Sequence, residues 1–132
     1  MKNKIFFSFS ETDRDIVTRI AKHAMDPSYE SLNFRVAPFY QRWQTKSIPV
    51  IQNIVAKALK DTNRTIVFVG EDTYESIWVD VEVDMSIELN NSVYAMRLNN
   101  TNGEIPKCLK ERDIKVENWD IEVLQFLAIR SQ

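Results

Sequence analysis

Glycine is scarce in this sequence, since Gly70 and Gly103 are the only two in 132 residues. A dinucleotide-binding Rossmann loop or a phosphate-binding P-loop needs several glycines, because backbone amides must approach the phosphates closely. Cysteine is scarcer still, and the single Cys108 has no partner for a disulfide and no companions for a structural zinc site. The sequence therefore disfavours both nucleotide-binding loops and predicts an intracellular protein without a metal.

An excess of positive charge and a long hydrophobic run are also missing. The net charge is -2, whereas proteins that bind nucleic acid or anionic membranes carry basic surfaces. The first apolar run, Ile5 to Phe7, is too short for a signal peptide or a membrane span. We therefore expect a cytoplasmic protein whose partners are neither nucleic acid nor membrane, but a small molecule or another protein.

The composition is that of an ordinary globular domain, with 44% hydrophobic and 27% charged residues. A length of 132 residues suits one domain with a single substantial core, and we assign residues 1–132 to it. The long loop at 99–113 contains Cys108 and has the composition of a connection. His23 falls on a helix far from the expected binding edge, and we give neither His23 nor Cys108 a chemical role.

Strand and helix patterns alternate along the chain. The run 65–69 is continuously apolar or β-branched and ends at Gly70, which is typical of a central strand covered on both faces. The alternation predicts a flavodoxin-like α/β fold with three layers, in which a five-stranded parallel sheet of order 2-1-3-4-5 lies between helices. The expected strands are 4–10, 33–37, 65–69, 92–98 and 114–119, and the expected helices are 12–27, 48–59, 74–90 and 121–129, with a short one near 107–110.

In such a sheet, ligands bind beyond the carboxyl ends of the strands, where the strand order reverses. The loops at 8–13, 38–46 and 70–78 should therefore build the site. Flavin mononucleotide is disfavoured, because the loop after the first strand is net acidic. A phosphoacceptor receiver domain is also disfavoured, because Gly70 stands at the end of the third strand where an aspartate is needed.

The helix expected at 74–90 carries acids on two different sides. Asp80, Asp84 and Glu88 form one stripe, which we interpret as a solvated face. Glu82 falls almost opposite this stripe, on the arc that holds Trp78. Burying a carboxylate without a partner is costly, so Glu82 is a candidate functional acid. The alternative is a helix rotated so that Glu82 reaches solvent or a nearby arginine.

Several segments taken together resemble one family. The first strand and its loop, Phe6-Phe7-Ser8-Phe9-Ser10 followed by Asp13, resemble the opening of TIR domains, and Trp78-Val79-Asp80-Val81-Glu82 resembles their tryptophan-x-x-x-glutamate motif. The stretch from Val67 to Tyr74, and the later Met85 to Glu88, are similar to the TIR-like proteins of prokaryotic Thoeris antiphage systems. The resemblance extends over residues 4–98.

The resemblance implies that NAD is a substrate, not a bound cofactor, and that its nicotinamide-ribose bond is cleaved. In Thoeris systems the product is a linear, cyclic or otherwise modified ADP-ribose signal, which a separate effector protein senses. By motif position the catalytic carboxylate is Glu82, and we expect it to be partly buried near Ser8 and Ser10. The residues expected to contact the substrate are Ser8, Phe9, Ser10, Asp13, Trp43 and Trp78.

Other readings remain open for parts of this interpretation. Trp43 could stack on a flat ring or pack at the rim, and for Trp78 we favour packing. The resemblance also implies self-association, which TIR catalysis commonly requires. A second hypothesis is a non-catalytic TIR-like adaptor that only assembles with partners, and a receiver-like switch is a distant third. An adaptor has no need for an acid at Glu82.

Overall fold

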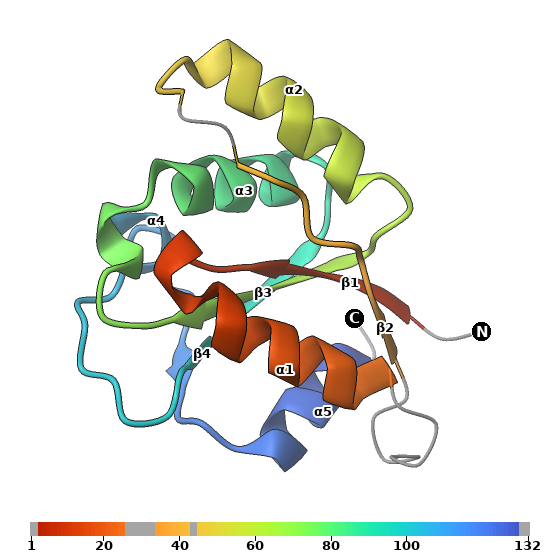
Figure 1. The fold of residues 1–132 in the computed structure, drawn as a ribbon, viewed down its shortest axis with the longest axis vertical. Helices are drawn as coiled ribbons and strands as arrows, with labels where there is room; N and C mark the ends of the chain where they lie inside the picture. The colour runs from red at the N-terminus through yellow and green to blue at the C-terminus, as the bar shows by residue number, and fades with distance from the viewer. Residues whose placement is uncertain (1–2, 26–33, 43–44, 130–132) are drawn as a thin grey trace.

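The structure of the chain, a computed structural model, describes residues 3–25, 34–42 and 45–129. Its centre is a parallel five-stranded sheet of order β2-β1-β3-β4-β5, so the predicted fold class and strand order are confirmed (Figure 1). Every neighbouring pair of strands is parallel, with Ser8 opposite Val67 at the end of the β1–β3 pairing. The strands are β1 Asn3–Ser8, β2 Phe34–Val36, β3 Arg64–Val69, β4 Ser92–Arg97 and β5 Val116–Glu117.

Helices cover both faces of the sheet (Figure 1). The apolar residues of α1 and α5 share one core cluster with Phe7, Phe68 and Met96, whereas α2 and α3 pack over the opposite face. Because side chains alternate along a strand, Phe7 points to the first face while Phe6 and Ser8 point toward α3. The helices are α1 Arg14–Met25, α2 Ile48–Leu59, α3 Ile77–Glu88, α4 Lys107–Lys110 and α5 Ile121–Ile129.

Several predicted boundaries were wrong, and local capping explains the clearest case. The helix expected at 74–90 is a 3-10 turn, η2 Thr73–Glu75, followed by α3. Ser76 interrupts it with an extended backbone, and its hydroxyl accepts a hydrogen bond from the backbone N–H of Val79. The helix stops before Asn90, whose positive φ of 66° is incompatible with a right-handed helix.

The first and last strands are also shorter than predicted. β1 ends at Ser8, because Ser10 is already the N-cap residue of another 3-10 turn. This turn, η1 Glu11–Asp13, leads into α1. β5 pairs with β4 over two residues only, as expected for an edge strand with little apolar sequence. Within the described ranges, no helix is long and apolar enough to cross a membrane.

Candidate functional site

Glu82 is a fully buried carboxylate in the middle of α3, with 0% of its surface exposed. Its helix is tied to the sheet one turn later, where the hydroxyls of Ser86 and Thr65 lie 2.7 Å apart in a hydrogen bond. Asp84, by contrast, is exposed and pairs with Arg112 at the surface. Glu88 is exposed as well, but Asp80, predicted on the same solvated stripe, is half-buried beside Cys108. Glu82 is buried more deeply than expected.

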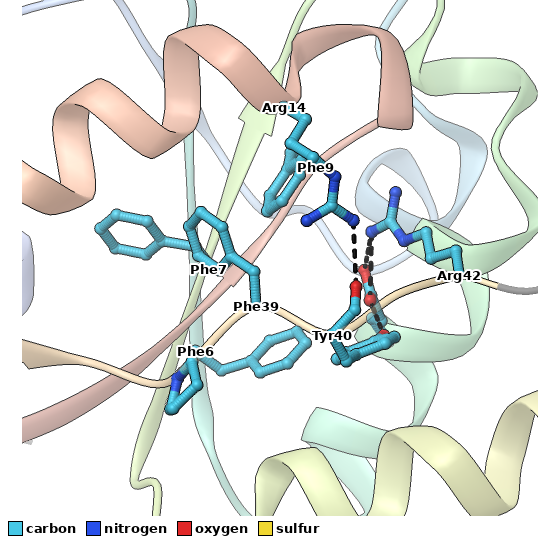
Figure 2. Close-up of a pocket in the computed structure, with 9 residues that line it drawn as sticks. Phe6, Phe7, Phe9, Arg14, Phe39, Tyr40 and Arg42 are labelled. Carbon is cyan, nitrogen blue, oxygen red and sulfur yellow. Dashed lines mark hydrogen bonds and ion pairs between the residues drawn. The ribbon is translucent and has the colours of Figure 1, made fainter.

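Three side chains donate hydrogen bonds to the Glu82 carboxylate. The Ser8 hydroxyl reaches Oε1 at 2.8 Å, and the Tyr40 hydroxyl donates to Oε2. Arg42 spans both oxygens with Nη2, at 3.1 Å from Oε1 and 3.2 Å from Oε2 (Figure 2). The two alternatives drawn from the sequence therefore both hold in part: Glu82 lies on a buried arc and also meets an arginine.

Burial raises the pKa values of the two acidic groups in this cluster, Glu82 and Tyr40. Burial raises the pKa of Glu82 above its ordinary value, and the Arg42 charge with the bonds from Tyr40 and Ser8 offset part of that rise. The pKa of Tyr40 is raised strongly by burial and by the neighbouring Glu82 charge. Tyr40 thus stays a hydrogen-bond donor across the physiological pH range.

Arg42 is nearly as buried as its partner, with 6% of its side chain exposed. Its guanidinium carbon lies 5.0 Å from the ring centre of Phe9 and 5.8 Å from that of Trp78, within the range of cation–π attraction. Among the described residues, no group accepts a hydrogen bond from its buried Nη1. The guanidinium is therefore well stacked but incompletely hydrogen-bonded.

The backbone before Arg42 is held against the end of β1. Arg14 donates from Nη2 to the carbonyl oxygen of Tyr40 at 3.0 Å and pairs with Glu11. Phe39 packs against Phe9, with ring centres 4.9 Å apart. These contacts fix the segment after β2 over the acid.

Three spaces meet at Arg42. One of them is an open groove of about 400 Å³ on the side of Arg14, lined by Glu11, Arg14, Phe39, Tyr40, Gln41 and Arg42. The other two lie on either side of the Arg42 side chain. One is a small cavity of about 10 Å³ next to Glu82, with room for no more than one water molecule. The other is an open groove of about 400 Å³ that does not reach Glu82. Arg42 lines both, so its side chain separates the acid from the groove. The groove is lined by Ser10, Glu11, Arg42, Asp72, Glu75, Ser76, Ile77 and Trp78.

Most sequence-predicted site residues gather at this edge of the sheet. Ser8 touches Glu82, Phe9 and Trp78 flank Arg42, and Ser10 lines the groove. Asp13 lies nearby but turns toward Gly70, where an added Cβ would stand 2.2 Å from its Oδ2. Trp43 lies outside the described residues.

Tyr40 and Arg42 are the site residues that sequence reasoning missed. Both belong to the loop 38–46, which the strand order already assigned to the binding edge. The available signal was electrostatic: a carboxylate buried at this edge needs a cation, and the loop holds an arginine. The sequence could not supply the loop path that brings Arg42 to Glu82.

Comparison with known proteins identifies the family of the chain. The family model described as "Thoeris protein ThsB, TIR-like domain" matches residues 6–103, more than half of the chain. The chain belongs to this ThsB TIR-like family. Its α/β fold also resembles the crystal structure of the TIR domain of the Toll-related receptor TRR-2 from Hydra magnipapillata, with a TM-score of 0.57. At 17% identity over 93% of this chain and 90% of that one, this likeness concerns the fold alone. No curated protein sequence matches.

The described part of the TIR-like domain offers no constellation for a metal. No group of three or more His, Cys, Asp or Glu side chains there is placed to hold an ion. Cys108 is buried, and burial together with Asp80 raises the pKa of its thiol to about 12, which keeps it protonated and unreactive.

Asp13 gives a prediction about the stability of the TIR-like domain. Burial and the charges of Asp72 and Glu71 raise its pKa, and its Oδ2 has no hydrogen-bond partner among the described residues. An acid whose pKa is raised by folding lowers stability as the pH rises through that pKa. Asp13→Asn, which removes the charge at this buried position, should therefore increase the free energy of unfolding at pH 7 by on the order of 1 kcal/mol.

Urea unfolding of both proteins at two pH values tests this. The gain should disappear near pH 3, where Asp13 is protonated in the folded and the unfolded chain alike. A variant that is less stable than the parent at pH 7 would show instead that the carboxylate makes a favourable contact.

Proposed function

We propose that this TIR-like domain cleaves NAD at the nicotinamide-ribose bond, with Glu82 as the catalytic carboxylate. The observation that carries the proposal is the buried Glu82 carboxylate, held by Ser8 at the carboxyl edge of the sheet beside an open groove. Ligands bind at this edge in open parallel sheets. Membership of the ThsB family and the tryptophan-x-x-x-glutamate spacing of Trp78 and Glu82 support the same assignment.

The chemistry asks little more of the protein than one placed carboxylate. Cleavage of the bond leaves positive charge on the ribose, in an oxocarbenium-like transition state that a nearby anion stabilises. Nicotinamide leaves as a neutral molecule and needs no general acid. Ser8 is a positioning residue in this scheme, because its hydroxyl fixes one oxygen of Glu82. The oxygen of water, or of a hydroxyl of the same nucleotide, then forms a bond to the ribose carbon and releases its proton to solvent.

Access to Glu82 requires a rearrangement. Arg42 stands between the acid and the groove, and the cavity beside the acid holds about 10 Å³. The ribose can reach the carboxylate only when Arg42 and Tyr40 give up their bonds to it. We therefore expect the arrangement seen here to be the resting form of the enzyme.

The products we propose are nicotinamide and a linear or cyclic ADP-ribose, made in the cytoplasm as a signal for a separate effector in antiphage defence. Incubation of concentrated protein with NAD, followed by chromatography, tests the reaction. Nicotinamide should accumulate together with an equal amount of an ADP-ribose product. NAD that stays intact with folded protein, over a range of concentrations up to the solubility limit, would overturn the proposal.

Self-association gives a second test of the enzyme hypothesis. If the active form is an assembly of copies, the rate per molecule should rise with protein concentration, because dilution dissociates the assembly. Initial rates over a wide dilution series measure this directly. A constant rate per molecule over that series would mean that a single copy is sufficient.

The complete pairing of Glu82 favours one other function, a non-catalytic adaptor. Ser8, Tyr40 and Arg42 satisfy both carboxylate oxygens, as they would if the acid only stabilised the fold. Removing Arg42 separates the two functions. An adaptor gains no reactivity toward NAD when its acid is uncovered, whereas the enzyme retains or increases it.

A further inference from the structure

The guanidinium of Arg42 occupies a slot with flat aromatic walls and an acidic end. We define this slot by the rings of Phe9 and Trp78, whose centres lie 5.0 Å and 5.8 Å from the guanidinium carbon, and by Glu82, which accepts hydrogen bonds from Nη2. The Phe9 ring also lies 5.6 Å from the guanidinium carbon of Arg14. Tyr40 borders the slot, with its ring centre 5.8 Å from that of Trp78. A slot of this shape and charge matches a flat, delocalised cation.

The hydrogen bonding of Arg42 in this slot is incomplete. Only its Nη2 bonds to Glu82, and Nη1 is buried without an acceptor in the described parts of the chain. An unsatisfied buried donor costs free energy, so the guanidinium can be displaced more cheaply than a fully bonded one. The residue is also carried on a loop rather than on a strand or helix.

The groove next to the slot has the same electrostatic preference. Three carboxylates, Glu11, Asp72 and Glu75, line it, and Arg42 is the only basic residue among its lining residues. Glu11 is paired with Arg14, which leaves Asp72 and Glu75 to set the local charge. An approaching cation is attracted here, whereas the phosphates of a nucleotide are better placed away from these acids.

We propose that the slot filled by Arg42 is a binding site for a planar organic cation, and that Arg42 acts as its internal competitor. Resting on the proposed function, the occupant is the positively charged nicotinamide ring of NAD, which would bring the ribose toward Glu82. The ring loses its charge when the bond breaks, so the slot releases nicotinamide more readily than it holds NAD. Arg42 then returns to Glu82.

The test measures the binding of a cation to the Arg42→Ala variant. Amide NMR shifts and calorimetry are the two readouts. The probe is 1-methylnicotinamide, a flat cation that cannot be cleaved like NAD, and neutral nicotinamide is the charge control. Arg42→Ala should bind the cation at least about 10-fold more tightly than the native protein, because the competitor is gone. Shifts should centre on Ser8, Phe9 and Trp78, and guanidinium ion should compete.

Arg112→Ala is the matched control, since it removes an arginine paired with Asp84 on the other side of the same helix. It should bind no more tightly than the native protein. If Arg42→Ala fails to fold, Arg42→Gln, which keeps more of the side chain, serves in its place. The proposal would be overturned if the native protein and the Arg42 variant bound 1-methylnicotinamide equally tightly. It would also be overturned if the Arg42 variant bound neutral nicotinamide as tightly as the cation.

The outcomes also separate the slot from the proposed reaction. Tight cation binding by Arg42→Ala without nicotinamide release from NAD would support the cation-binding slot and contradict the proposed NAD cleavage. Nicotinamide release by a variant that shows no preference for the cation would support the proposed NAD cleavage and contradict the cation-binding slot. Loss of cation binding in the double variant Arg42→Ala, Glu82→Gln is expected, because the acidic end is then neutral.

Discussion

Glu82→Gln should reduce nicotinamide release from NAD by at least about 1,000-fold, the scale on which losing one well-placed stabilising group slows a reaction. The amide keeps the size of the side chain, and its single oxygen can accept the hydrogen bond of Ser8 while its NH2 group donates to the Tyr40 hydroxyl. It lacks the negative charge that opposes the charge on the ribose. Initial rates of nicotinamide formation, measured at equal protein and NAD concentrations, give the ratio.

Two controls keep this result interpretable. Asp84→Asn makes the same chemical change on the exposed side of α3 and should alter the rate little. Far-ultraviolet circular dichroism and the unfolding midpoint of Glu82→Gln should remain close to those of the parent, since Arg42 can turn toward the groove that it already lines. A Glu82→Gln protein with substantial NAD cleavage would exclude this carboxylate from the chemistry.

Phe7→Ala should lower the free energy of unfolding by about 3–5 kcal/mol, as expected for an aromatic side chain removed from a closed core. Phe7 is 2% exposed and meets Phe68 edge to face, with ring centres 4.7 Å apart. It also packs on Phe34 and Phe39, so the cavity left behind has several large walls that cannot all collapse inward. Domains of this kind are stable by about 5–15 kcal/mol in total.

Urea unfolding measures the loss, and Phe126→Ala is its control. Phe126 is 57% exposed on α5, so the same truncation there should cost far less. Because Phe39 belongs to the segment that covers Glu82, Phe7→Ala should also loosen that segment, which amide hydrogen exchange in residues 39–42 can detect. Equal losses for Phe7→Ala and Phe126→Ala would mean that the aromatic cluster carries no special part of the stability.

Much of the fold could be predicted because its central elements have unambiguous patterns. Residues 66–69 of β3 are apolar on both faces of the sheet, and all six residues of the strand are buried, as is typical of a central parallel strand. The alternation of strands and helices then leaves few topologies, and the observed strand order is the commonest of them. The errors concern ends, where single residues such as Ser76 decide the boundary through their own hydrogen bonds.

The candidate site could be predicted only where regular structure carries it. Helical periodicity separates Glu82 from Asp84, and strand alternation directs Ser8 to the same face as α3. Tyr40 and Arg42 belong to an irregular segment, whose path depends on contacts with Phe9 and Arg14 that are distant in sequence. No local sequence pattern encodes that path, so the position of Tyr40 and Arg42 over Glu82 could be seen only in the structure.

The shared fold with the TRR-2 domain of Hydra magnipapillata carries no information about activity, because one fold hosts many functions. What distinguishes an enzyme from an adaptor here is the local arrangement around Glu82. The structure shows a buried acid, a cation that covers it and an adjoining groove, and we propose that this site opens to admit the substrate. The same three elements also make the hypothesis accessible to single substitutions.

The most direct test of the central claim is a structure of the protein bound to an NAD analogue whose nicotinamide-ribose bond cannot be cleaved. Our account predicts that Arg42 leaves Glu82, that the nicotinamide ring lies between Phe9 and Trp78, and that the ribose carbon faces the Glu82 carboxylate. An analogue bound elsewhere with the Arg42–Glu82 pair intact would contradict the account.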